Sequence, residues 1–241
     1  MRYAVLSDIH ANLEALRAVL ADLAGRADTV LCLGDMVGYG ADPGPCLELL
    51  AERAQAITAG NHEHGVTGRL DLGWFNRYAR AAAEWTRERL DSAHLDYLDR
   101  LPVRVEVEDA TLVHASPAQP EEWDYLVRAE DGLAAFPAFA TRLCFVGHSH
   151  VPAMWSLGSS GPDYALGPES IEVEHGRRYI VNVGSVGQPR DGDPRAAYAL
   201  WDLDQGRVTL RRVAYDLTVA RAKIVDSGLP RFLGDRLAAG A

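Results

Sequence analysis

Short apolar runs that end in glycine, aspartate, asparagine or histidine recur through the first 150 residues of the chain. In one of them, residues 30–33 read Val-Leu-Cys-Leu and lead directly into Gly34 and Asp35, after which Gly38 and Gly40 loosen the backbone. A short run that is apolar throughout indicates a strand buried on both faces, and open α/β sheets bind ligands at the carboxyl ends of such strands. Asp35 is therefore predicted to lie at the tip of a buried strand, in a ligand-binding position.

The order of the predicted elements in the first hundred residues favours an α/β fold. Strands are predicted at 3–7, 29–33 and 54–59, with helices at 12–23 and 43–53 between them. Asn12 is a typical N-cap for the first helix, and Asp42 followed by Pro43 is typical of the start of the second. Alternating strands and helices favour a parallel sheet flanked by helices. Two further helices are predicted at 77–90 and 91–100.

Beyond residue 103 the pattern is dominated by strands. They are predicted at 103–107, 111–114, 142–146, 153–157, 178–183, 197–203 and 208–214, and the turn at 204–206 joins the last two as a hairpin. Two facing β-sheets flanked by helices, an α/β/β/α sandwich, accommodate this number of strands. We expect a single domain over 1–241, with an excursion at about 115–137, a loop at 158–168 and C-terminal helices at about 217–238.

Charge and cysteine content limit the expected partners. The chain has 34 Asp and Glu residues against 24 Lys and Arg, a net charge of -10, which disfavours binding to duplex nucleic acid. No apolar run reaches the ~18 residues of a spanning helix and the N-terminus has no signal-peptide pattern, so no membrane partner is expected. Cys32 and Cys144 lie in apolar runs, and with Cys46 they form no C-x-x-C pair, which favours a reducing cytoplasm. The expected partner is a small phosphorylated molecule, and a homo-oligomer is left open.

The polar clusters after the predicted strands carry side chains that bind metals. Asp8 and His10 follow the first strand two positions apart, so both can point to the same side. The full set of candidate ligands is Asp8, His10, Asp35, Asn61, His114, His148 and His150. Imidazole, carboxylate and amide oxygen together suit divalent first-row ions. Seven ligands suit two ions ~3.5–4 Å apart that share a carboxylate such as Asp35, an arrangement used in phosphoryl transfer.

Five motifs occur in a specific order. They are Asp8-x-His10, Gly34-Asp35, Gly60-Asn61-His62-Glu63, His114 and Gly147-His148-Ser149-His150. In this order the chain resembles the calcineurin-like metallophosphoesterases, and it is most similar to their small bacterial and archaeal phosphodiesterase branch. The later stretch at 182–190, which reads Asn-Val-Gly-Ser-Val-Gly-Gln-Pro-Arg, is also similar to that branch.

The resemblance implies a role for each motif residue. One metal would be held by Asp8, His10 and His150, and the other by Asn61, His114 and His148, with Asp35 bridging the two. The expected ions are two divalent metals, Mn²⁺ preferred, with Fe, Ni, Zn or Co as alternatives. A hydroxide that bridges the metals would attack phosphorus, and His62 would donate a proton to the leaving alkoxide. Glu63 is expected to orient a neighbouring imidazole.

One departure from the superfamily bears on the substrate. Protein phosphatases and bacterial dinucleoside tetraphosphatases of this superfamily have Asp-Arg-Gly or Asn-Arg-Gly after Gly-Asp, whereas this chain has Gly38-Tyr39-Gly40. The arginine that would grip phosphate is therefore missing there. We expect a phosphoric ester hydrolase, most simply a phosphodiesterase. The alternatives are a dinucleoside polyphosphatase, a protein phosphatase or a non-catalytic scaffold. Tyr39, Ser185 and Arg190 are the candidate substrate contacts.

Three further residues lie near the motifs or in the excursion at 115–137. His64 is expected to be a surface histidine, because the motif gives it no ligand role. Trp123 and Tyr125 could stack on the base of a substrate, although aromatic residues in a long excursion more often pin it to the core.

Overall fold

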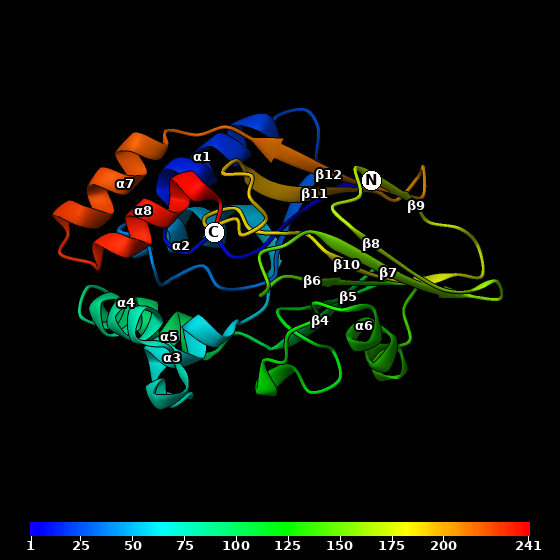
Figure 1. Ribbon diagram of the computed structural model, residues 1–241, viewed down its shortest axis with the longest axis horizontal. Coiled ribbons are helices and arrows are strands. Elements are labelled where there is room, and N and C mark those ends of the chain that lie inside the picture. The colour runs from blue at the N-terminus through cyan, green and yellow to red at the C-terminus, as the bar shows by residue number, and fades with distance from the viewer.

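Strand β1 (Arg2–Leu6) is buried on both faces, which places it between two apolar layers. Tyr3 and Val5 belong to a core between two sheets, whereas Ala4 and Leu6 pack in a second core beneath helices. This strict alternation follows from the two-residue period of a strand. The computed structural model, which describes residues 1–241, thus consists of two facing sheets with helices on their outer sides (Figure 1).

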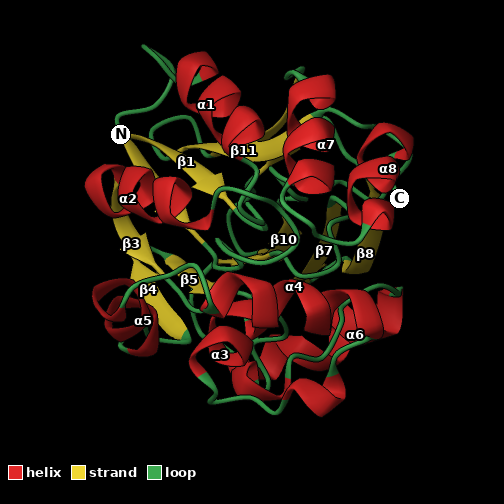
Figure 2. Cartoon of the chain, turned by 90° about the vertical axis from the view of Figure 1, so that its left-hand side faces the viewer, coloured by secondary structure: helices red, strands yellow, loops and turns green.

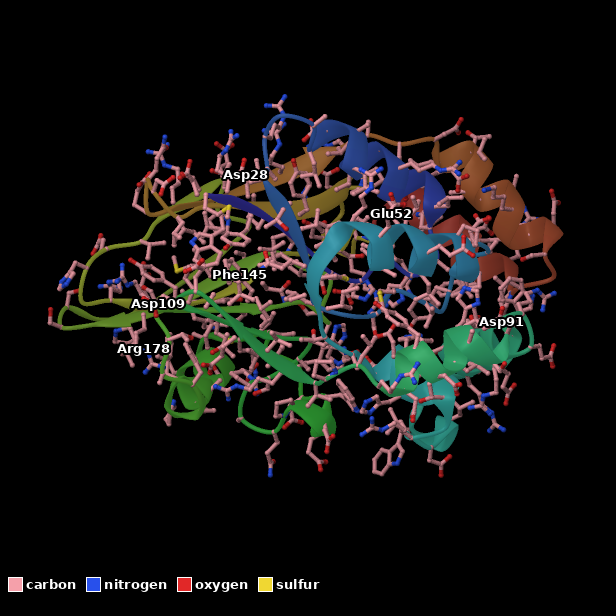
Figure 3. All side chains as sticks on the ribbon, turned by 180° about the vertical axis from the view of Figure 1, so that it is seen from behind. Asp28, Glu52, Asp91, Asp109, Phe145 and Arg178 are labelled. Atoms are coloured by element: carbon pink, nitrogen blue, oxygen red, sulfur yellow. The ribbon has the colours of Figure 1, made fainter.

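Each sheet has six strands. The first sheet has the order β3 (Ala54–Ile57), β2 (Thr29–Cys32), β1, β11 (Ala196–Asp202), β12 (Arg207–Val213) and β9 (Ser170–Glu172). The second has the order β4 (Arg104–Val107), β5 (Ala110–Val113), β6 (Leu143–Val146), β10 (Arg178–Asn182), β7 (Ala153–Gly158) and β8 (Gly161–Leu166). The core between them includes Phe145, Trp201 and Val181, and Figure 3 shows Phe145 in the interior.

Helices cover both outer faces (Figure 2). On the first sheet lie α1 (Leu13–Asp22), α2 (Pro43–Arg53), α7 (Leu217–Asp226) and α8 (Arg231–Ala239). Helices α3 (Asn61–Thr67), α4 (Arg77–Arg87) and α5 (Ser92–Asp99) pack in the same apolar cluster as α1 and α2, through Val66, Ala83 and Leu98. The outer face of the second sheet is covered by α6 (Ala129–Ala135) and the 3₁₀ helix Phe136–Ala138. Two further 3₁₀ helices, Leu72–Trp74 and Pro120–Glu122, lie in connecting segments. None of these helices has both the length and the apolar character that a membrane-spanning helix requires.

The predicted α/β/β/α sandwich is confirmed, and most predicted elements are present with ends within a few residues of the expected ones. Asn12 caps α1 by accepting the N–H of Ala15. Asp42 precedes α2 as expected, but its carboxylate accepts a hydrogen bond from Lys223 of α7 instead of capping the helix. That bond ties the C-terminal helices to the first sheet's helical layer.

The prediction of a loop at 158–168 is wrong. Residues in this stretch form β8, which pairs with β7 as a hairpin in which Gly158 faces Gly161. The Gly- and Ser-rich composition marks only the turn. Pro162 is tolerated because β8 is an edge strand, where a missing N–H donor need not break a ladder. The short strand β9 and the helix α3 were not predicted either.

Candidate metal centre

The carboxyl ends of six strands meet at one edge of the two sheets. In the first sheet β1, β2 and β3 are parallel, and in the second β5, β6 and β10 are parallel. The residues that follow these ends are Asp8 and His10 (β1), Asp35 (β2), Asn61 (β3), His114 (β5), His148 and His150 (β6) and Ser185 to Arg190 (β10). Parallel pairing thus brings together residues far apart in the sequence.

The ligand atoms of these residues form two buried groups, which are linked where Asp35 Oδ2 lies 3.7 Å from His10 Nε2. Asp8, His10 and His150 make one group, and Asp35, His114 and His148 make the other, with all ligand atoms of a group within 4.8 Å of one another. A third group of the same size joins His10, Asp35 and His62. The structure therefore brings His62 into the cluster, although the sequence motif assigns it no ligand role.

Backbone carbonyls fix the tautomers of three imidazoles. The Nδ1 atoms of His10, His114 and His150 lie 3.1, 3.0 and 2.5 Å from the carbonyl oxygens of Val37, Leu33 and Gln188. A carbonyl only accepts, so each Nδ1 carries a proton and each Nε2 points into the site. When the ring is neutral, the lone pair of Nε2 is available to a cation. Metal-binding histidines are commonly oriented this way.

Several of the atoms that could bind a metal have no hydrogen-bond donor or positive charge beside them. The Nε2 atoms of His10 and His150 lie 3.1 Å apart, which places two lone pairs face to face in the neutral rings. Asp8 Oδ1 and Asn61 Oδ1 are buried without a hydrogen bond. Buried lone pairs without a partner are suited to divalent cations, for which oxygen and imidazole nitrogen are ordinary ligands.

Electrostatics within the cluster are dominated by its two carboxylates. Burial opposes their ionisation, yet His150 and His114 hold the pKa of Asp8, and His114 and His62 hold that of Asp35, below the usual range. Burial would also lower the pKa of His114, but Asp35, whose Oδ2 lies 3.3 Å from its Nε2, and Asp8 raise it to about 9. Positive charge is thus favoured between the two carboxylates.

The loops of the site are held in an unusual backbone conformation. Nine residues other than glycine have positive φ, and all except Glu108 lie on the loops around the site. Six of them, with φ between 48° and 64°, are Asp8, His10, Asp35, Tyr39, His148 and His150. This left-handed region costs free energy for residues with a Cβ atom, and it persists where surrounding contacts enforce it.

Glu63 supplies many of those contacts, in a role that differs from the expected one. Its carboxylate accepts the backbone N–H groups of Asp35, Met36, Val37 and Gly60 at 2.7–3.3 Å, and no imidazole. It thereby joins the loop after β2 to the start of α3. Burial and the charge of Asp35 raise the pKa of Glu63 to about 7.

Ser185 also serves the backbone of the site. It is fully buried, donates a hydrogen bond from Oγ to the carbonyl of Asp8 and accepts one from the N–H of Gln188, both at 2.8 Å. These bonds hold the loop after β10 against the loop after β1. The structure leaves Ser185 no exposed atom with which to contact a substrate.

The ring of His62 has a nitrogen without a hydrogen-bond partner. The Nδ1 atom of His62 is buried without a hydrogen bond, and its ring packs against Tyr39 and Phe75 with centroids 4.5 and 5.1 Å apart. Burial lowers the pKa of His62 to about 3. A Cβ atom at Gly38 would lie 2.1 Å from Nδ1, so this position requires glycine.

Arg190 lies beside Tyr39 at the edge of the cluster. Its guanidinium carbon is 5.7 Å from the Tyr39 ring centroid, and its only side-chain hydrogen bond runs to the Oε1 of Gln188. Burial raises the pKa values of Tyr39 and Tyr125, and the charge of Arg190 opposes both shifts. Its Nε is buried without a hydrogen-bond partner.

The aromatic residues of the 115–137 excursion lie against the metal centre. Tyr125 is half exposed and stacks on His148 with centroids 4.0 Å apart. Trp123 is buried and packs edge-on against His64, which makes the expectation of a surface His64 wrong. The burial of His64 depends on a segment distant in the sequence, and no local pattern could have indicated it.

Comparison with known proteins agrees with this geometry. Residues 1–206 match the calcineurin-like phosphoesterase superfamily domain. The chain belongs to that superfamily. It is 46% identical to a metallophosphoesterase of Sphaerobacter thermophilus, whose crystal structure matches with a TM-score of 0.87 over 100% of this chain and 99% of the other.

Two further relatives of this calcineurin-like phosphoesterase extend over the whole chain. The uncharacterized protein MJ0912 of Methanocaldococcus jannaschii is 40% identical, and the match covers 98% of this chain and 97% of that protein. The hypothetical protein PH1004 of Pyrococcus horikoshii is 21% identical and has the same fold, with a TM-score of 0.79 and 100% and 98% of the two chains covered.

We predict that Glu63→Ala destabilises the protein by at least about 3 kcal/mol, because each buried N–H left without an acceptor costs about 1–3 kcal/mol. Glu63→Gln, which keeps one acceptor oxygen, should lose less. The free energy of unfolding in denaturant measures both. Glu52→Ala, at the exposed surface of α2 (Figure 3), is the matched control and should change stability by less than about 0.5 kcal/mol. Equal stability of Glu63→Ala and Glu52→Ala would contradict the assigned role.

Proposed function

We propose that the protein is a metal-dependent phosphoric ester hydrolase, most simply a phosphodiesterase, with two cation positions that share Asp35. The observation that carries this proposal is a chain of buried ligand groups in which the group of Asp35, His114 and His148 is joined to that of Asp8, His10 and His150 through Asp35 and His10, whose ligand atoms lie 3.7 Å apart. Divalent cations held there, Mn²⁺ first among them, would lower the pKa of coordinated water and neutralise charge on phosphate oxygens, the requirements of phosphoester hydrolysis.

The proposed division of ligands follows the geometry of the two groups. Asp8, His10 and His150 would hold one cation, and His114 and His148 the other. Asn61 is assigned to the second position because its Oδ1 is buried without a hydrogen bond. It is the first residue of α3, whose next residue, His62, donates its N–H to Asp35. The six carboxylate and imidazole side chains of the expected set are buried and lie in the ligand groups, which favours a hydrolase over a non-catalytic scaffold.

The proposed roles of His62 and Arg190 rest on their free polar atoms. His62 would donate a proton from its ring to the leaving oxygen, because Nδ1 has no other partner and the aromatic contacts fix the ring. The charge of a bound phosphate would raise the pKa of His62, which burial lowers in its absence. Arg190 would bind a non-bridging phosphate oxygen from the side of Tyr39. It would thus replace the arginine that the Gly38-Tyr39-Gly40 segment lacks.

Asp35→Asn tests the shared ligand. The amide keeps the shape of the side chain but removes the charge and one metal-binding oxygen, so we expect bound metal to fall and hydrolysis of bis(p-nitrophenyl) phosphate to be abolished. Metal content after dialysis is measured by elemental analysis, beside an assay with each divalent ion in turn. Asp204→Asn, at an exposed carboxylate, is the control. Full occupancy and full activity of Asp35→Asn would refute the proposal.

His62→Ala tests the proton donor. We expect metal content to be unchanged and turnover to fall ~10²–10⁴-fold, the usual contribution of a general acid. The loss should be larger for an alkyl ester, whose leaving group needs a proton, than for a p-nitrophenyl ester. His175→Ala, at an exposed histidine, controls for the substitution itself. A wild-type rate with the alkyl ester would rule out the assignment.

Arg190→Met tests the phosphate contact. A charge-assisted hydrogen bond contributes about 1.5–3 kcal/mol, so we expect KM to rise at least about tenfold with a smaller change in kcat. Arg195→Met, an exposed arginine of the following segment, should leave both constants unchanged. A fall in kcat alone would place Arg190 elsewhere in the reaction.

A further inference from the structure

A pocket of about 470 Å³ opens beside the metal centre and shares two residues with it. Asn61 and His148, both assigned above to one cation position, line it, so a molecule bound there would reach the ligand cluster. Its volume is in the range of small-molecule sites. The expected phosphodiesterase mechanism does not use this space, because the phosphate itself lies on the ligand atoms.

The walls of this pocket are aromatic. They include Trp74, Phe75, Trp123 and Tyr125. Trp74 is 83% exposed at the end of the 3₁₀ helix Leu72–Trp74, and Tyr125 is 52% exposed. Exposed apolar side chains that gather in one pocket, unlike single ones, mark an interaction site. Exposed rings next to a phosphate site form a stacking platform for a planar group.

The rings are supported from behind. Tyr125 stacks on His148 at an interplanar angle of 23°, and Phe75 packs on His62. Trp123 contacts His64 and His114 edge-on. The positions of these three rings are thus coupled to the residues of the metal centre, and they lose little conformational entropy when a planar group binds.

The remaining side of the pocket is acidic. Glu121 and Glu122, from the 3₁₀ helix Pro120–Glu122, line it, and only Glu121 has a cationic neighbour, Arg69 at 3.8 Å. Carboxylates accept hydrogen bonds from amino groups and repel further phosphates. An acyl chain would leave them unused, and a polyphosphate would be repelled. A planar ring with amino groups fits both the acidic and the aromatic sides.

We propose that this pocket binds the base of a nucleoside phosphate ester whose phosphate lies at the metal centre. The inference rests on the proposed function, because it assumes that the ligand cluster holds the phosphate. Trp74 and Tyr125 are the stacking residues, and Glu121 and Glu122 contact the exocyclic groups of the base. The substrate class is thus a nucleotide rather than a phosphoprotein or a phospholipid.

The test compares two compounds that differ only in the base. Isothermal titration of the Mn²⁺-loaded protein with AMP and with ribose 5-phosphate measures what the base adds to binding. We expect AMP to bind at least tenfold more tightly, since a stacked base commonly contributes that much or more. Phenyl phosphate serves as a third probe, and it should bind more weakly than AMP.

Variants then locate the effect. Trp74→Ala removes an exposed side chain and should fold normally; it should weaken AMP binding about tenfold and leave ribose 5-phosphate binding unchanged. Tyr125→Ala should act in the same direction. Leu166→Ala, at an exposed leucine of β8 outside the pocket, is the matched control and should change neither constant.

The outcomes separate this inference from the proposed function. Equal binding of AMP and ribose 5-phosphate, or of AMP and phenyl phosphate, overturns the nucleoside assignment even if aryl diesters are hydrolysed. Tighter binding of AMP that depends on Trp74 supports it, even if no ester is hydrolysed with any divalent ion. In that last case the hydrolase proposal fails alone.

Discussion

Two buried carboxylates, Asp8 and Asp35, flank His114, whose Nε2 lies 3.9 Å from one and 3.3 Å from the other, and the rest of the structure depends on balancing their charge. Isolated ionised carboxylates are costly to bury, so they need cations or protonated partners close by. Imidazoles surround them, and the one between the two carboxylates, His114, has a strongly raised pKa. The site is therefore built to hold positive charge at its centre.

The two sheets are joined at this site by its own loops. The N–H of His148, from the second sheet, donates to Asp8 Oδ2 at 3.0 Å, and the N–H of Gly187 donates to the carbonyl of Asp8 at 2.9 Å. A Cβ atom at Gly187 would lie 1.8 Å from the carbonyl oxygen of Ile9, so the backbones are in direct contact. Close backbone packing of this kind keeps the ligands preorganised at the cost of strained φ angles.

The sequence was sufficient for the fold class, and it picked out most of the side chains that the structure gathers at one edge of the sheets, because both depend on local patterns. Asp8, Asp35 and His114 each follow a short apolar run, and the parallel order of the strands brings their ends together. The roles of Glu63 and Ser185 could not be predicted in this way. Their partners are backbone groups of other loops, and a side chain that binds a distant backbone leaves no pattern in its own neighbourhood.

The same distinction explains the wrong local predictions. A strand at 161–166 was hidden by the glycines and serines of its turn, since the composition of a hairpin turn outweighs a short half-exposed edge strand. The residues one helical turn from His64 are Gly60, Asn61, Thr67 and Gly68, which form no apolar face, yet the ring of Trp123 covers it. Burial of this kind is a property of tertiary packing alone.

The chemistry and the neighbouring pocket are encoded in separate stretches of the chain. The ligands follow strands whose pairing fixes them, whereas Trp74, Trp123 and Tyr125 come from segments that lie outside both sheets. Substitutions in those segments can therefore change the pocket while the strand-end loops that carry the ligands keep their pairing. Selectivity in such a scaffold can diverge rapidly between relatives that keep one and the same catalytic apparatus.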